Sequence, residues 1–96
     1  MAYFFVKTHD KPGADLDGLD MKFITGELQM PEGWQYYVSK SEPVGYSIIE
    51  AKNLEEVQAL LAPYKDYYEI VELAEIISFE KLLSYKKKRL KSAADN

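Results

Sequence analysis

The sequence predicts an α+β domain in which two helices cover one face of a four-stranded antiparallel sheet. Segments rich in aromatic and β-branched residues alternate with segments of helical periodicity in the order β-α-β-β-α-β, and one more helix follows. Right-handed crossovers place both helices on the same side, which gives a ferredoxin-like sandwich. With 96 residues the chain has the length of one domain. We expect residues 1–91 to form it and residues 92–96 to be a flexible tail.

The first strand and the first helix are expected between residues 3 and 30. The stretch "YFFVKTH" at residues 3–9 is aromatic and β-branched and contains no breaker, so it is expected to be extended. Pro12 and Gly13 then favour a turn. Apolar residues at helical spacing, with acids in the first turns, predict a helix over about 15–30.

The middle of the chain predicts a strand pair followed by a helix. Residues 34–40 and 44–51 read as two strands joined by a short turn. Asn53 is expected to begin the second helix, because Glu56 follows three residues later in a capping-box pattern. Pro63 is expected to end it, because the proline ring clashes with the carbonyl four residues earlier.

The last strand is expected over residues 67–77, "YYEIVELAEII". Ser78 is expected to cap a terminal helix. The apolar residues of that helix are expected to face the core: Phe79, Leu82, Leu83 and Leu90.

Bulky residues occupy both faces of the predicted strands, so two helices cannot cover all of them. The helices are expected over the face with Phe4, Val6, Ile49, Val71 and Leu73. The other face is expected to hold Tyr3, Phe5, Tyr36, Val38, Tyr46, Ile48, Ile70 and Ile76. Monomers usually leave only about a few hundred Å² of apolar patch bare. We therefore expect a homodimer packed sheet against sheet, with an interface of Tyr3, Phe5, Tyr36, Val38, Tyr46 and Ile48.

Four features of the sequence belong together: the β-α-β-β-α-β order and the stretches "KPGAD", "PEGW" and "SIIEAKNLEEVQALLAPYKDYYEIVELAEI". With these features the chain resembles a family of short, functionally uncharacterised bacterial and archaeal proteins. That family belongs to the dimeric α+β barrel superfamily, and the resemblance covers about residues 3–77. It implies a dimer whose two sheets form a barrel. Relatives in the superfamily include cofactor-free monooxygenases, lactone isomerases, haem-binding enzymes and ligand-sensing domains. None of their motifs is matched here, so none of their functional residues is transferred.

Polar and aromatic residues mixed on the second face favour a ligand site there. The candidate ligand-binding residues are Lys7, Trp34, Tyr36, Tyr46 and Glu72. Lys7 and Glu72 are expected to be cross-strand neighbours. The alternative interpretation is that these residues only make interface hydrogen bonds and that Trp34 packs against a loop or a subunit.

His9, the single histidine, is the one candidate for a general base, because histidine is the side chain type that ordinarily exchanges a proton near neutral pH. The alternative is a surface histidine at a strand end. One histidine and no cysteine cannot make a convincing metal site, and we expect no metal and no cofactor.

Charge and composition restrict the partners. Residues 1–85 hold seven Lys against 15 Asp or Glu, which disfavours nucleic acid, whereas residues 86–96 hold five bases and one acid. The stretch "VGYSIIEA" resembles the third strand of an RNA-recognition motif only superficially, because Val44, Ile48 and Ala51 replace its basic and aromatic residues. No signal peptide or membrane span is recognisable, and a cytoplasmic location is expected.

The leading functional hypothesis is therefore a small dimeric protein that binds an apolar or aromatic molecule in a cleft at the sheet. Two alternatives stay open at this point. The first is a protein-interaction or assembly module with a solid barrel and no ligand. The second is a cofactor-free isomerase or monooxygenase, by analogy with the superfamily alone.

Overall fold

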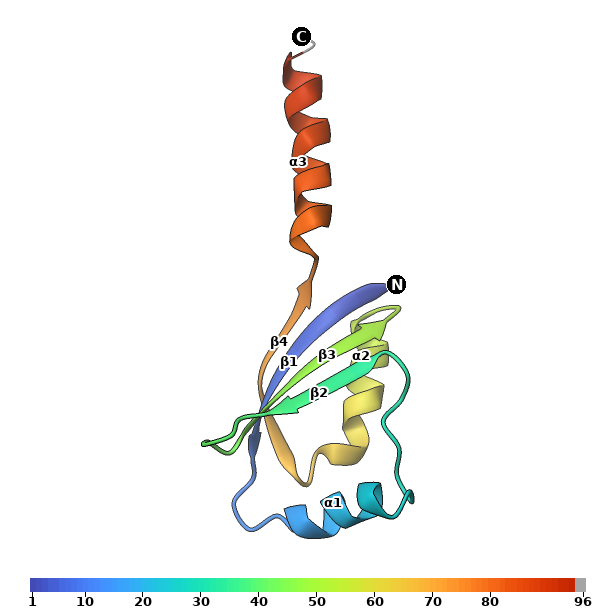
Figure 1. Ribbon diagram of the computed structural model, residues 1–96, viewed down its shortest axis with the longest axis vertical. Coiled ribbons are helices and arrows are strands. Elements are labelled where there is room, and N and C mark those ends of the chain that lie inside the picture. The colour runs from blue at the N-terminus through green and yellow to red at the C-terminus, as the bar shows by residue number, and fades with distance from the viewer. Residues whose placement is uncertain (95–96) are drawn as a thin grey trace.

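The computed structural model describes residues 1–94 and shows an α+β domain built on a four-stranded antiparallel sheet (Figure 1). The strands are β1 (Ala2–Asp10), β2 (Trp34–Val38), β3 (Val44–Ala51) and β4 (Tyr68–Ile76), in the spatial order β2-β3-β1-β4. The helices are α1 (Leu16–Ile24), α2 (Leu54–Leu61) and α3 (Phe79–Ala94), and a 3₁₀ turn, η1 (Ala62–Tyr64), follows α2. The expected α+β class and element order are confirmed.

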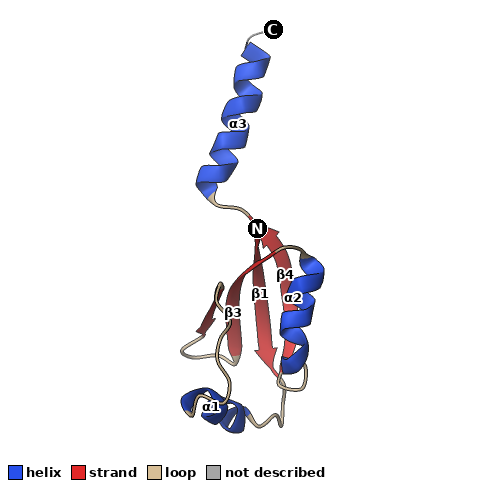
Figure 2. Cartoon of the chain, turned by 90° about the vertical axis from the view of Figure 1, so that its right-hand side faces the viewer, coloured by secondary structure: helices blue, strands red, loops and turns tan. Residues whose placement is uncertain are grey.

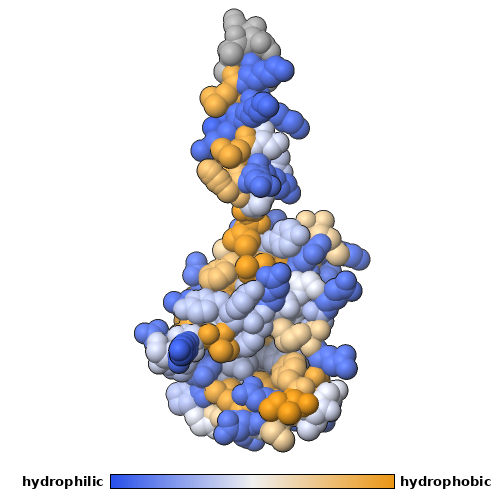
Figure 3. All heavy atoms as spheres, in the orientation of Figure 1, coloured by the Kyte–Doolittle hydropathy of each residue, from blue (hydrophilic) through white to orange (hydrophobic). Residues whose placement is uncertain are grey.

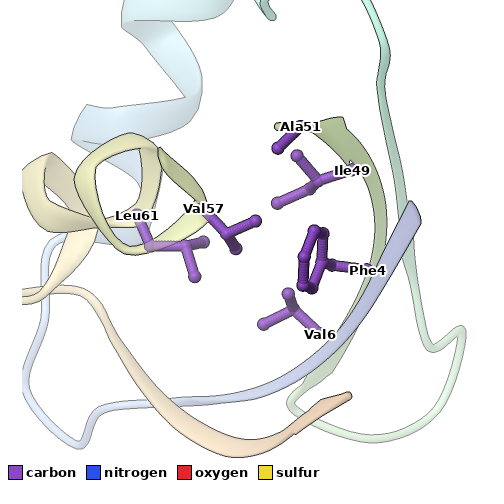
Figure 4. Packing of buried hydrophobic residues seen from close by; sticks show 6 residues of the cluster. All are labelled: Phe4, Val6, Ile49, Ala51, Val57 and Leu61. Atoms are coloured by element: carbon purple, nitrogen blue, oxygen red, sulfur yellow. The ribbon is translucent and has the colours of Figure 1, made fainter. Parts of the chain in front are cut away.

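The core lies between α2 and the sheet (Figure 4). Phe4 and Val6 of β1 and Ile49 of β3 meet Val57 and Leu61 of α2, and all five are buried. Val57 and Leu61 are four residues apart, which places them on one face of the helix. α2 begins where the sequence predicts, because the Oδ1 atom of Asn53 accepts a hydrogen bond of 2.9 Å from the backbone N–H of Glu56.

α1 differs from the expected helix in length and in place. The Oδ1 atom of Asp15 accepts a hydrogen bond of 2.9 Å from the N–H of Gly18 and caps the helix start. Gly26 has a φ of 83°, which few other residues adopt, and the helix ends just before it rather than near residue 30. α1 lies beyond the ends of the strands instead of beside α2 on the sheet (Figures 1 and 2). The prediction of two helices layered on one face is therefore wrong.

The register of β2 corrects the predicted face of three residues. Trp34, Tyr36 and Val38 pair with Ile49, Ser47 and Gly45, whose side of the sheet is the α2 side. Tyr37 pairs with Tyr46 on the other side. Placing Trp34, Tyr36 and Val38 on the uncovered face was wrong. A strand with bulky residues on both faces carries no internal signal that selects one register.

A bulge in β4 corrects another face. Lys7 pairs with Glu72, but Thr8 pairs with Ile70, so Val71 is an extra residue on β4. The bulge moves Ile70 to the α2 side and leaves Val71 55% exposed, which is the reverse of the prediction for both. Beyond the bulge, Ile76 pairs with Tyr3 on the uncovered side, as expected.

α3 leaves the domain instead of packing on it (Figures 1 and 2). Ser78 caps it as predicted, because its Oγ accepts a hydrogen bond of 3.1 Å from the N–H of Lys81. The helix then extends outward, and the molecule is 61 Å long. The prediction that its apolar residues face the core is wrong, since Phe79 and Leu90 are 62% and 63% exposed and Leu82 and Leu83 are exposed too.

The division into a domain of residues 1–91 and a flexible tail of residues 92–96 stays a prediction. α3 continues to Ala94, and residues 95–96 lie outside the described part of the chain. Within residues 1–94, no helix is both long enough and apolar enough to cross a bilayer.

Candidate functional site

A pocket of about 520 Å³ opens between the sheet, α1 and the segment that follows α2. Figure 3 shows a recess on this face above α1, with hydrophobic side chains at its lower rim. Its walls are mainly apolar and aromatic. The residues that line it are Thr8, Leu19, Asp20, Phe23, Ile24, Met30, Trp34, Tyr36, Ser47, Leu61, Tyr64, Lys65, Tyr68 and Ile70.

The position of α1 creates this pocket. A second helix beside α2 would cover the sheet near β2, whereas α1 lies across the end of the strands and leaves that area open. Leu19 is the buried residue of α1, and Phe23 follows it on the same face of the helix. The bulge in β4 supplies Ile70 to the opposite wall. Irregular features of the fold therefore form the walls of the pocket.

Small residues in the sheet make room for larger ones. Gly45 and Ser47 of β3 face the pocket side, next to Tyr36 and Thr8. A Cβ atom on residue 45 would collide with the Tyr36 hydroxyl and approach Thr8 Oγ1 to 3.0 Å. The glycine therefore lets the Tyr36 hydroxyl lie directly over the backbone of β3.

The hydroxyl groups of Ser47 and Thr8 on the sheet differ in their hydrogen bonding. Trp34 Nε1 donates a hydrogen bond of 3.0 Å to Ser47 Oγ, so both side chains are satisfied. Thr8 Oγ1 is fully buried and makes no hydrogen bond to any described residue, although the Tyr36 hydroxyl lies close to it. A buried hydroxyl without a partner costs about 1–3 kcal/mol. The Tyr36 hydroxyl, which lies close to both Thr8 and Tyr68, is placed to offset that cost.

Tyr36 and Tyr68 form the polar end of the pocket. Their ring centroids are 6.5 Å apart. Burial raises the pKa of the Tyr36 hydroxyl. Burial also raises the pKa of Tyr68, and the neighbouring Tyr36 and the carboxylates of Asp20 and Asp10 raise it further. Both phenols therefore stay protonated near neutral pH and can donate hydrogen bonds.

A second group of rings forms the apolar end. Tyr64 of η1 meets Trp34 edge to face at 5.7 Å and stacks on Phe23 at 6.5 Å. This arrangement joins β2, the turn after α2, and α1. Burial raises the pKa of Tyr64 as well. The rings present flat apolar surfaces, which are typical of sites for small aromatic ligands.

The predicted ligand-binding residues separate into two groups. Trp34 and Tyr36 line the pocket. Lys7, Tyr46 and Glu72 lie on the opposite face of the sheet, where Lys7 pairs with Glu72 as expected and also with Tyr46. These five residues therefore do not form one site.

His9 lies outside the pocket. Its ring is exposed at the end of β1, with Nδ1 2.8 Å from the backbone oxygen of Asp10. It pairs with Glu69 on the side of the sheet away from the pocket. In the described residues, no group of three or more His, Cys, Asp or Glu could hold a metal ion.

Sequence reasoning did not find Thr8, Ser47, Tyr64 and Tyr68 as pocket residues. A usable signal was present for two of them. The stretch "PYKDYY" at residues 63–68 places three tyrosines between a proline and a strand, and such clusters favour surfaces that bind ligands. Thr8 and Ser47 have no comparable signal, because a small polar residue in a strand has many roles.

Comparisons of the chain with family models, with curated proteins and with solved structures give no match. The function is therefore argued from the geometry of the pocket.

Proposed function

We propose that the protein binds a small, uncharged aromatic molecule with one hydrogen-bonding group in the pocket between the sheet, α1 and η1. The observation that carries the proposal is the pocket itself, whose mainly aromatic and aliphatic walls hold the side chains of Tyr36 and Tyr68 side by side. Pockets for small molecules typically have volumes of about 300–1,000 Å³ and a few polar groups in mainly apolar walls. The 520 Å³ pocket with its rings and hydroxyls fits that description.

The polar groups favour a neutral ligand. Burial keeps Tyr36 and Tyr68 protonated. The hydroxyls of Thr8, Tyr36 and Tyr68 lie in a row, so when Thr8 donates to Tyr36 and Tyr36 donates to Tyr68, the Tyr68 hydroxyl can donate to an acceptor on the ligand. A carboxylate or phosphate is disfavoured, because Asp20 lines the pocket and Lys65 is the single cationic residue among the lining residues.

The homodimer and the ferredoxin-like barrel stay part of the proposal. The strand order β2-β3-β1-β4 with antiparallel pairing supports a ferredoxin-like arrangement, whereas the position of α1 departs from it. The apolar residues on the uncovered face support self-association. Packing of one sheet directly on another and a cytoplasmic location stay predictions. An isomerase or monooxygenase gains no support from His9, because His9 does not line the pocket.

The proposal is tested with a matched pair of ligands, 4-ethylphenol and ethylbenzene. Trp34 is the single tryptophan, so its indole N–H gives one isolated NMR signal inside the pocket. We expect both compounds to shift this signal and 4-ethylphenol to bind more tightly. Tyr68→Phe should weaken 4-ethylphenol about fivefold, the equivalent of one hydrogen bond of roughly 1 kcal/mol, and leave ethylbenzene unchanged.

Tyr46→Phe is the control, because it removes a hydroxyl from the opposite face of the sheet. It should leave both affinities unchanged. Equal binding of the two ligands, with no effect of Tyr68→Phe, would reject Tyr68 as the polar anchor. A Trp34 signal that moves with neither ligand would reject the pocket as a site for this class of molecule.

A further inference from the structure

We propose that α3 is an arm that packs on the uncovered face of the sheet in a second copy of this chain. The uncovered face is the side away from α2, and its apolar and aromatic residues are Tyr3, Phe5, Tyr37, Tyr46, Ile48, Ala74 and Ile76. The inference rests on the homodimer proposed above and names the element that makes the contact. α3 would take the place of the sheet-on-sheet packing that the sequence predicts, because both need the same face. It is independent of the pocket.

α3 has an apolar stripe that its own subunit does not cover. Phe79, Leu83, Lys86 and Leu90 recur at intervals of four, three and four residues, which places them on one side of the helix, and Leu82 lies next to them. The four apolar members are exposed, and Figure 3 shows hydrophobic side chains along the helix. Isolated helices of about this length are marginally stable in water, so α3 needs a packing partner.

The uncovered face lacks a second layer. Phe5 stacks on Tyr46 with ring centroids 6.4 Å apart, and Ile48 pairs with Phe5 beside them. Tyr3 remains 47% exposed. No helix lies over this side of the sheet within residues 1–94 (Figure 2). Among the described residues, neither of these two apolar surfaces, the stripe and the face, therefore has a partner.

The connection between β4 and α3 favours a partner in another chain. Only Ile77 and Ser78 separate the end of β4 from the start of α3. Most connections in compact domains have about four to six residues, and a helix that reverses onto its own sheet needs room to turn. The short connection instead holds α3 pointing away from the domain, within reach of a neighbour.

Charge also matches the arm to the face. The uncovered face carries Glu50, Glu69 and Glu72 around its apolar centre, against Lys7. α3 carries six basic residues and one acid, and Lys86 lies within the apolar stripe itself. A lysine among leucines can place its stem on the apolar surface and its ammonium group next to an acid at the edge.

The two surfaces are similar in length. A helix of 16 residues is about 24 Å long, and a strand of nine residues is about 30 Å long. In a two-fold dimer each subunit gives one arm and receives one, so the contact occurs twice. Stable interfaces bury about 800 Å² on each partner, and two helix-on-sheet contacts can approach that area.

Cysteine pairing tests this arrangement, because the natural chain has no cysteine. The full-length variants Leu83→Cys and Ile48→Cys are oxidised separately and as a mixture. We expect a disulfide-linked dimer in the mixture and none with either variant alone. The control Ser84→Cys lies on the other side of α3 and should not pair with Ile48→Cys. Light scattering on the natural chain should give twice 11.1 kDa.

The other outcomes would overturn the inference in distinguishable ways. A mass of 11.1 kDa would reject the homodimer together with the arm. A dimer in which Ile48→Cys pairs with itself would establish direct packing of sheet on sheet and would reject the arm alone. A disulfide within a single chain that carries both cysteines would show that α3 folds back on its own domain.

Discussion

Thr8 shows how one residue connects the fold with the proposed function. Its neighbours Phe4 and Val6 on the same face of β1 are part of the core under α2. Two residues further along the strand α2 no longer covers the sheet, so the same face becomes the wall of the pocket. The hydroxyl is buried there with no hydrogen-bond partner among the described residues. The change from valine to threonine marks where the core ends and the pocket begins.

The buried phenols predict a dependence of stability on pH. Burial raises the pKa of Tyr36 and of Tyr68 above the ordinary value of 10.0. Above pH 10 the unfolded chain therefore loses these protons before the folded chain does. The stabilisation is complete below pH 10 and is lost as the pH rises through the folded-state values.

We expect the free energy of unfolding, measured with urea, to fall steadily from pH 9.5 to pH 11 in the natural protein. Tyr68→Phe should make this decrease smaller, since it removes one of the tyrosines whose pKa burial raises. Measurements of both proteins at pH 8 supply the reference for each. An equal decrease in the natural protein and the variant would contradict the buried position of Tyr68.

At the scale of the elements, the helix cap of α2 should stabilise the core. Asn53 Oδ1 accepts the Glu56 N–H, and α2 carries Val57 and Leu61 into the core. Asn53→Ala should lower the free energy of unfolding by about 1 kcal/mol. Gln58→Ala, an exposed position in the middle of the same helix, should change it by less than about 0.5 kcal/mol. A urea titration in which the two variants are alike would argue against the cap.

The sequence predicted elements with local signals and failed where the structure depends on distant contacts. β3 has the predicted bounds 44–51, and Asn53 and Ser78 cap the predicted helices, because strand composition and caps are local. The register of β2 depends on its pairing with β3, and the bulge at Val71 depends on β1. Neither the register of β2 nor the bulge in β4 produces a residue pattern within its own strand.

The dependence of strand register on distant contacts also explains why the predicted ligand-binding residues lie on two faces of the sheet. Trp34 and Tyr36 were selected as ligand-binding residues and do line the pocket, but the face on which they were placed was wrong. An error of one residue in register moves a side chain to the other side of a sheet. Tyr46, assigned to the same site, therefore lies on the opposite side. The contribution of α1 could not be predicted, because its position depends on where the chain leaves β1 and not on its own periodicity.

At the scale of the molecule, the two sides of one sheet have separate roles. The side that α2 covers only in part holds the pocket, and the side without a helix is the proposed surface for the arm of a second copy. Thr8 and Lys7 are neighbours in sequence and yet lie on opposite sides. This separation allows the ligand and the assembly to be tested independently.

Intermolecular nuclear Overhauser effects from bound 4-ethylphenol would test directly whether the ligand occupies the pocket between the sheet, α1 and η1. We expect the ring protons of the ligand to show these effects with methyl groups of Thr8, Leu61 and Ile70, which line the pocket. Effects with Ile48 and Ile76 on the uncovered face instead, or none with any methyl group, would contradict the proposal that the ligand binds in the pocket.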